Sequence, residues 1–289
     1  MTIRTTLYGT DNYRATLHYV SAAASTVIVF DHWEDRPSLD AESPGARFFV
    51  NTGHNVVGIK TARNDWYQGA EMGDVCSAVL AGTPSHFRIG YGGSMGGYAA
   101  INFAADLQLD LVIAICPQFS IDPAKAPFER RWLTEACTIT FHQDKIDQAR
   151  HARGYLVFDP CTVDRLHAEL ILAHHDLLPI RIHHGGHDQM LMLQQCGMLA
   201  TILIEMVHNR FDLSACLELV RRRRRGSVVF WLNLAVALAR HGRHEMSHQA
   251  LLAARALPDS DLPSFQWRFH AALTACLAAS VHCPPRKIS

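Results

Sequence analysis

Ser94 is flanked by glycines, and this spacing could make its hydroxyl group a nucleophile. The residues Gly92-Gly93-Ser94-Met95-Gly96 match the pattern G-x-S-x-G. In that pattern a sharp turn between a strand and a helix presents the serine at a strained apex, and glycines two residues away on either side avoid collisions. The backbone amide of Met95 would then face a developing oxyanion. A glycine-rich phosphate loop is the alternative, but no Lys-Ser or Lys-Thr follows as in a P-loop.

The elements around Ser94 are predicted to be strands and helices in alternation. Residues 4–20 read as an antiparallel hairpin, since 13–20 alternate apolar and polar residues after a turn signal. Apolar runs typical of covered strands occupy 26–30, 55–60, 87–91, 111–116, 155–158 and 179–183. Helix-compatible stretches occupy 70–81, 95–106, 162–175 and 189–208. This alternation predicts an α/β fold, with a mostly parallel sheet, helices on both faces and the hairpin at one edge.

The glycine-serine turn between a strand and a helix, together with this order of elements, resembles the α/β-hydrolase family over roughly residues 5–205. The resemblance implies a Ser-acid-His triad in that chain order, with the acid after a late strand and the histidine after the last one. Carried over to this chain, Ser94 is the nucleophile, His187 the general base and then acid, and Asp159 the carboxylate that orients His187. Asp164, five residues after Asp159, is the alternative acid.

His187 lies in the segment HHGGHDQM, where three histidines compete for the role. Gly185 and Gly186 favour His187 because they form the turn that would aim it inward. A metal site made of His183, His184, His187 and Asp188 is the alternative. The segment lacks a recognisable ligand spacing such as H-E-x-x-H, so we predict neither a metal nor another cofactor.

The second oxyanion donor is expected after the strand 26–30, where family members often carry His-Gly. This chain has Asp31-His32-Trp33 instead, which makes the amide of His32, or alternatively that of Asp31, the expected donor. Trp33, Trp66 and Tyr67 could form a wall for the substrate. Plain packing of loops over the sheet explains these aromatic residues equally well.

The segment between the strands 111–116 and 155–158 is where the family often inserts a lid. Here the segment 117–154 is short, carries many charged residues and is not notably apolar. The resemblance therefore favours a small or polar ester, thioester or acylated sugar over a lipid. The predicted function is a serine-dependent acyl hydrolase acting on a carboxylic ester through an acyl-serine intermediate.

The last part of the chain is predicted to be a small all-α module, giving domains at 1–208 and 209–289. Trp231-x-x-x-Ala235-x-x-x-Ala239, Gly242 at a turn, an alanine-rich second helix and Pro258 resemble one tetratricopeptide repeat. Such a module could hold a protein partner or a second copy of the chain. The five arginines 221–225 form either a solvated helix face or a site for an acidic protein, a phosphate or an anionic membrane surface.

Composition narrows the class of protein. Of 289 residues, 48% are hydrophobic and 19% charged, and the formal net charge is zero, which is typical of a globular chain and gives no reason to expect a nucleic-acid partner. The eight cysteines are scattered singly without a C-x-x-C pair, and no apolar signal core or membrane-length run occurs. We expect a cytoplasmic protein without a transmembrane segment.

Two other functions are compatible with the same residues. An acyltransferase would use the same triad and acyl-serine but pass the acyl group to an acceptor other than water. A catalytically silent scaffold would use the hydrolase fold and the helical module to bind a protein partner.

Overall fold

The computed structural model describes residues 3–84, 86–148 and 152–281. One of the cysteines, Cys283, lies outside the described residues. Contacts divide the chain into two compact units, Met1–Arg181 with Leu203–Arg210 and Ile182–Ile202 with Phe211–Ser289. Each unit is described by itself. The predicted domain limits, 1–208 and 209–289, stay a prediction.

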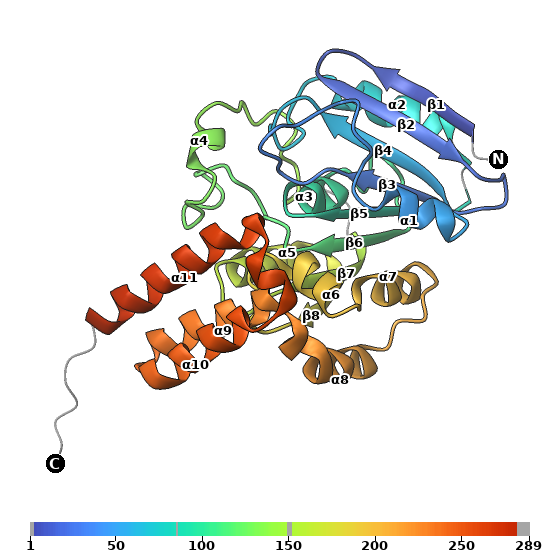
Figure 1. The fold of residues 1–289 in the computed structure, drawn as a ribbon. Coiled ribbons are helices and arrows are strands. Elements are labelled where there is room, and N and C mark those ends of the chain that lie inside the picture. Colours follow the sequence, from blue (N-terminus) through green and yellow to red (C-terminus); the bar gives the residue numbers. More distant parts are fainter. Residues whose placement is uncertain (1–2, 85, 149–151, 282–289) are drawn as a thin grey trace. The chain divides into compact units, whose positions relative to one another are not determined.

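The first unit is built on an eight-stranded sheet (Figure 1). The strand order is β1-β2-β4-β3-β5-β6-β7-β8. The strands are β1 (Ile3–Gly9), β2 (Tyr13–Tyr19), β3 (Thr26–Phe30), β4 (Asn55–Thr61), β5 (Arg88–Gly93), β6 (Leu111–Ile115), β7 (Arg153–Phe158) and β8 (Asp176–Arg181). The pairs β1–β2 and β2–β4 are antiparallel, and the remaining pairs are parallel. The predicted parallel sheet with an antiparallel amino-terminal hairpin is confirmed.

Helices pack on both faces of this sheet, because alternate strand residues point to opposite sides. Ile28 and Phe30 belong to a core that includes residues of α2 (Met72–Gly82), α3 (Met95–Asn102) and α5 (Asp164–His174). On the other face, the ring of Tyr91 lies 5.1 Å from that of Phe49 in α1 (Ala46–Asn51). The short helix α4 (Leu133–Ala136) interrupts the segment between β6 and β7. Helices on both faces were predicted and are confirmed.

The second unit is helical. It contains α6 (Gln189–Gln195), α8 (Leu213–Arg223), α9 (Val228–Arg240), α10 (His244–Arg255) and α11 (Pro263–Val281), with two short 3₁₀ turns at Arg224–Gly226 and Pro258–Asp261. The residues of α7 (Leu199–Val207) are divided between the units. Helices α9 and α10 meet at Gly242, whose φ of +70° suits glycine, and pack through Ala235, Ala239 and Ala250. The tetratricopeptide likeness and the protein-partner expectation for this module stay predictions.

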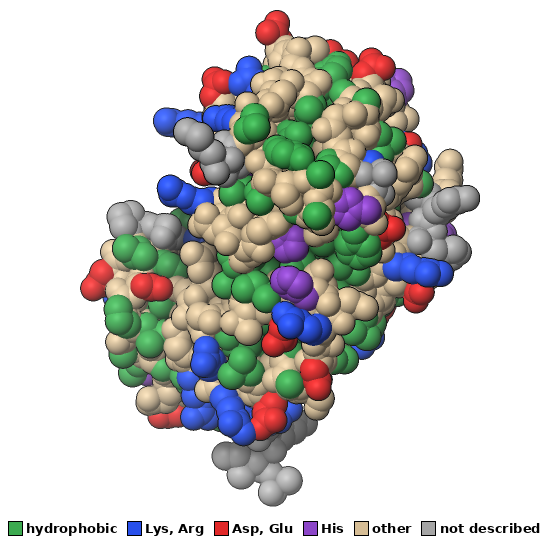
Figure 2. Space-filling model, turned by 90° about the vertical axis from the view of Figure 1, so that its right-hand side faces the viewer, with side chains coloured by type: hydrophobic (Ala, Val, Ile, Leu, Met, Phe, Trp, Pro, Cys, Tyr) green, Lys and Arg blue, Asp and Glu red, His purple; other side chains and the backbone are tan. Residues whose placement is uncertain are grey.

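One local prediction was wrong. Residues 189–208 were expected to form one helix, but the helix stops at Gln195, and Gly197 turns the chain with a φ of +64°. The arginines 221–225 close α8 and form the following 3₁₀ turn, where Arg222 pairs with Glu218 and Arg224 lies over the ring of Phe230. On the face shown in Figure 2, acidic and basic side chains lie among one another.

Among the described residues, no single helix has the length and apolar composition needed to cross a membrane. One bent pair, Gln189–Gln195 with Leu199–Val207, would meet that requirement by length and composition only.

Candidate active site

Ser94 stands at a strained turn between β5 and α3. Its backbone has a φ of +52° and a ψ of −121°, a conformation that residues other than glycine rarely adopt. Its amide donates to the carbonyl oxygen of Ile115 in the neighbouring strand at 2.9 Å, which ties the turn to the sheet. Strain of this kind persists only where the surroundings hold it, and it clusters at functional sites.

Gly96 makes this turn possible through a close backbone approach. A Cβ atom on Gly96 would lie 2.4 Å from the carbonyl oxygen of Phe30, at the end of β3. No side chain fits at that distance, so the start of α3 approaches the end of β3 closely only because residue 96 is glycine. The amide of Met95 belongs to the first turn of α3, where N–H groups have no carbonyl partner within the helix.

Two further turns at the carboxyl ends of the strands carry the same kind of strain. After β4, Trp66 and Tyr67 have φ of +50° and +57°, and directly after β6, Cys116 has a φ of +48°. Since β6 is the neighbour of β5, and β4 is separated from it only by β3, these turns lie along the same edge of the sheet as Ser94. Strain is therefore concentrated at this edge of the first unit.

Gln118 contacts the hydroxyl group of Ser94. Its Nε2 donates to Ser94 Oγ at 3.1 Å, and its Oε1 accepts from the indole Nε1 of Trp66 at 3.3 Å. Gln118 is completely buried. Gln118 was not predicted from the sequence, although its position two residues beyond the predicted strand 111–116 was a usable signal.

Both candidate acids are buried in the first unit, after the end of β7. Asp159 follows Phe158 directly, and its Oδ1 accepts from the amide of Cys161 at 2.9 Å. Asp164 is the first residue of α5, and its Oδ1 accepts from Arg131 at 2.7 Å. A carboxylate oxygen of Asp164 also lies within 4.8 Å of the sulfur of Cys116, the residue that follows β6.

Asp164 belongs to an ionic cluster whose carboxylates and histidine are buried. Arg131 bridges Asp164 and Glu129, and Glu129 in turn accepts from Nε2 of His167 at 2.8 Å. Burial alone would raise the pKa of Glu129, but the hydrogen bonds from His167 and Arg131 and the charge of Arg131 outweigh it and lower the pKa to about 2. The cluster joins the segment between β6 and β7 to α5. Neither Glu129 nor Arg131 was predicted from sequence.

His187 belongs to the second unit, where its loop is held by several contacts. Nε2 of Gln189 donates to the carbonyl oxygen of Ile182 at 2.6 Å, across the loop. A Cβ on Gly185 would collide with Gln189 at 2.3 Å, and Gly186 has a φ of +62°. Arg268 binds both carboxylate oxygens of Asp188, at 2.9 and 3.0 Å. The residues on both sides of His187 are thus fixed within this unit.

Asp31, whose backbone amide is a candidate oxyanion donor, has its side-chain carboxylate in an ion pair. It pairs with Lys60 in β4, and both side chains are buried. Burial raises the pKa of Asp31 despite this partner. The negative charge of this side chain is therefore paired with Lys60, and the amide of His32, or alternatively that of Asp31, remains the expected second donor.

The three aromatic residues expected to form a substrate wall differ in their environment. Tyr67 is fully buried, and its single hydroxyl hydrogen is shared between the carbonyl oxygens of Asp31 and Ile59, both 3.2 Å from the phenol oxygen, so its contacts are those of a packing residue. Trp66 contacts Gln118, as described above. Trp33 is partly exposed and donates to Glu135 at 2.8 Å. The rings of Trp33 and Trp66 both contact Trp132, with centroids 5.6 and 5.3 Å apart.

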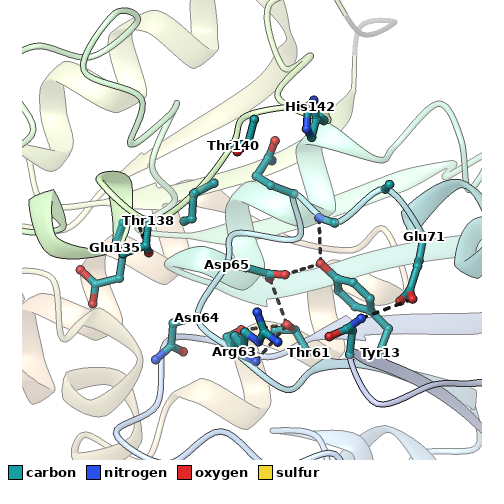
Figure 3. Close-up of a pocket in the computed structure, with 15 residues that line it drawn as sticks. Tyr13, Thr61, Arg63, Asn64, Asp65, Glu71, Glu135, Thr138, Thr140 and His142 are labelled. Carbon is teal, nitrogen blue, oxygen red and sulfur yellow. Dashed lines mark hydrogen bonds between the residues drawn. The ribbon is translucent and has the colours of Figure 1, made fainter.

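A pocket of about 690 Å³ is lined in part by Glu135, the residue that accepts from Trp33 (Figure 3). The turn before β2, the loop after β4 and residues 135–142 supply its lining, and Trp66 and Gln118 are not part of it. Its walls carry the polar side chains Asn12, Tyr13, Thr61, Arg63, Asn64, Asp65, Gln68, Glu71, Glu135, Thr138, Thr140 and His142. Tyr13 donates to Asp65, and its hydroxyl accepts from the amide of Gly69 at 2.9 Å. The volume is within the range of small-molecule sites, and the lining suits a polar ligand.

No protein-family model matches the sequence, and no curated protein matches it. The chain is similar to the capsule O-acetyltransferase of Neisseria meningitidis serogroup A, with 11% identity, 70% of this chain and 93% of that chain covered, and a TM-score of 0.50. It is also similar to a putative hydrolase from Agrobacterium vitis S4, with 14% identity, coverage of 71% and 98%, and a TM-score of 0.49. A third similar structure is XC6422 from Xanthomonas campestris, an a/b serine hydrolase without lid. It has 17% identity, 76% of this chain and 94% of that chain covered, and a TM-score of 0.41. At these identities the likeness concerns the fold alone, which is the α/β-hydrolase fold.

Proposed function

We propose that the protein is a serine-dependent acyl hydrolase acting on a carboxylic ester, with Ser94 as the nucleophile. The observation that carries the proposal is the backbone of Ser94, held at a φ of +52° between β5 and α3 at the carboxyl edge of the sheet. This is the geometry that exposes a nucleophile and brings helix amides to the reacting oxygen.

In the proposed reaction His187 takes the proton of the Ser94 hydroxyl while Oγ attacks the ester carbonyl. The carbonyl electron pair moves onto its oxygen, and the resulting oxyanion is stabilised by the amide of Met95 and by that of His32 or Asp31. Collapse expels the alcohol, which receives the proton from His187, and leaves an acyl-serine. Water, deprotonated by His187, then attacks the acyl carbonyl. Collapse breaks the bond to Ser94 Oγ, which takes the proton back from His187, and the acid is released.

Chain length supports a role for His187. It follows Arg181, the last residue of β8, by six residues, which extended chain can stretch over about 20 Å. β5 and β8 are separated by three strand intervals, or about 15 Å. The fixed loop around His187, with Gly185 packed on Gln189 and Asp188 bound by Arg268, would hold the imidazole in one orientation.

The proposed acid is Asp159 or Asp164. Two observations within the first unit favour Asp164. Its carboxylate lies near Cys116, at the end of the strand next to Ser94, and it forms an ion pair with Arg131. Asp159 has the position that the family resemblance predicts, and the amide of Cys161 orients its carboxylate. Single substitutions of Asp159 and Asp164 distinguish these two candidates.

We infer a small, polar acyl substrate. The polar pocket beside Trp33 supports this class, since its hydrogen-bonding side chains would satisfy hydroxyl groups that an apolar pocket could not. An acyltransferase is the second candidate. An O-acetyltransferase shares the fold, and both reactions pass through the same acyl-serine.

The experiment is turnover of p-nitrophenyl acetate by the wild type, Ser94→Ala and His187→Ala, with added glycerol to compare acyl acceptors. We expect release of p-nitrophenol by the wild type and a loss of at least about 10³-fold in both variants. Acetate as the sole acyl product would support the hydrolase, whereas formation of acetylglycerol would support the transferase. Equal turnover by the wild type and Ser94→Ala would contradict both.

A further inference from the structure

Gln118 forms a chain of two hydrogen bonds that ends on the hydroxyl of Ser94. Nε1 of Trp66 donates to Oε1 of Gln118 at 3.3 Å, and Nε2 of Gln118 donates to Ser94 Oγ at 3.1 Å. Gln118 is fully buried and Trp66 nearly so. The bond between Trp66 and Gln118 is therefore shielded from water, which strengthens it, whereas the hydroxyl of Ser94 at the other end is partly exposed.

Chemistry fixes the orientation of the Gln118 amide. An indole nitrogen carries a hydrogen and can only donate, so the atom of Gln118 that faces Trp66 must be the carbonyl oxygen. The amide NH₂ group then points to Ser94, because it is the other end of the same planar group. The side chain of residue 118 is thus oriented as a donor toward the nucleophile.

Trp66 is itself held in place. Its carbonyl oxygen accepts from Nε2 of Gln68 at 3.1 Å, and its ring lies 5.3 Å from that of Trp132. Its φ of +50° is unfavourable for a large side chain and needs such support. The backbone of Cys116, with a φ of +48°, turns the chain after β6 so that Gln118 follows in the same turn. Trp66 and the chain segment that carries Gln118 are therefore both preorganised.

We propose that Gln118 is a catalytic residue that donates a hydrogen bond to the negative oxygen formed in the reaction of Ser94. In the free protein its Nε2–H bonds to Ser94 Oγ. As Oγ attacks, it becomes a neutral oxygen bonded to the acyl carbon, its proton leaves to the base, and the carbonyl electron pair moves onto the neighbouring carbonyl oxygen. The Gln118 NH₂ group then shifts its hydrogen bond from Oγ to that negative oxygen, with no covalent bond to Gln118 formed or broken. Because the amide is already oriented toward the reacting atoms and a hydrogen bond to a charged oxygen is stronger than one to a neutral hydroxyl, the transition state is stabilised more than the ground state. This inference rests on the proposed role of Ser94.

The test compares Gln118→Met and Gln118→Glu with the wild type. Methionine has a similar volume but no donor, and glutamate keeps the acceptor for Trp66 while losing the donor to Ser94. With p-nitrophenyl acetate we expect kcat to fall about 10²-fold in both variants while KM changes little, as for loss of one oxyanion donor. The rate of Ser94 labelling by a fluorophosphonate should fall in parallel. Trp66→Phe, which removes only the indole N–H, should give a smaller loss of kcat.

A buried amide elsewhere in the unit provides the control. Asn102 is also fully buried, donating to the carbonyl oxygen of Gln143 at 2.8 Å and accepting from the amide of Lys145 at 3.0 Å, without contact to Ser94. Asn102→Leu should lower the thermal unfolding midpoint without the specific loss of kcat. Folded Gln118 variants with kcat within threefold of the wild type, or an equal loss of kcat in Asn102→Leu, would overturn the inference and leave the proposed function standing. Equal turnover by the wild type and Ser94→Ala would overturn both.

Discussion

Gly92 and Gly96, which lie two residues before and two residues after Ser94, are in direct backbone contact. A Cβ atom added to Gly92 would lie 2.3 Å from the carbonyl carbon of Gly96 and 2.4 Å from its oxygen. The turn thus folds back on itself, with no room for a side chain on its inner side. The two glycines of the G-x-S-x-G pattern are required by this contact rather than by flexibility.

Gly96→Ala should therefore destabilise the first unit and abolish the chemistry of Ser94. The new methyl group collides with backbone at the end of β3, which cannot move as a side chain could, so we expect the free energy of unfolding to fall by about 2–3 kcal/mol. Urea unfolding measures it. The matched control is Gly73→Ala in α2, where an added Cβ meets nothing within 4 Å. That variant should be neutral or more stable by up to about 1 kcal/mol. A Gly96→Ala protein as stable as Gly73→Ala would refute the steric explanation.

Asp159→Asn and Asp164→Asn should separate the two candidate acids. The variant that removes the true acid should lower kcat by about 10³–10⁴-fold, because the imidazole loses its orienting partner and the stabilisation of its charged form. We expect the large loss for Asp164→Asn. Both variants should be compared by thermal unfolding, since Asp164 also binds Arg131. A large loss confined to Asp159→Asn would assign the role to Asp159 and leave Asp164 as an ion-pair partner of Arg131.

The cluster around Glu129 predicts a loss of stability in acid. The pKa of Glu129 in the folded protein, about 2, is below the ordinary value of 4.5, so its ionised form stabilises the fold above pH 4.5 and this contribution disappears as the pH falls toward 2. The shift corresponds to about 3 kcal/mol. The free energy of unfolding, measured between pH 6 and pH 2, should decrease as the pH falls. Glu129→Gln should reduce the slope of this pH dependence. An unchanged slope in Glu129→Gln would show that other carboxylates cause the acid sensitivity.

The pair Asp31–Lys60 should behave as a coupled unit. Lys60→Met leaves a buried carboxylate without its cation, and we expect a loss of about 3–5 kcal/mol. The double variant Asp31→Asn/Lys60→Met should recover much of this, because no charge remains buried. A double-mutant cycle from urea unfolding gives the coupling energy. Strictly additive effects would mean that the two side chains do not depend on each other.

Much of the first unit was predictable from local sequence patterns. The strands around Val57 and Ile113 are continuous apolar runs, and each is a strand in the structure, because covered parallel strands need apolar residues on both faces. The turn at Ser94 was predicted from its glycines. The break at Gly197 was missed because a single glycine inside a helical pattern is often tolerated, so only the backbone turn reveals that it ends the helix.

The partners of the candidate site were not predictable in the same way. Gln118 contacts Trp66 and Ser94 across 52 and 24 positions of the chain, and Arg131 contacts Asp164 across 33. Such pairs arise from sheet order and loop packing, which no periodicity in the sequence reports. The sequence identified the turn at Ser94, and the structure was needed to find what holds and touches it.

The most direct test of the central claim is labelling by a fluorophosphonate probe, followed by intact-mass measurement and peptide mapping. The account predicts one adduct per wild-type chain, located on Ser94, and none on folded Ser94→Ala. His187→Ala should label far more slowly, because the hydroxyl lacks its base. Labelling that persists in Ser94→Ala, or a folded wild type that takes up no probe, would contradict the assignment of Ser94 as the nucleophile.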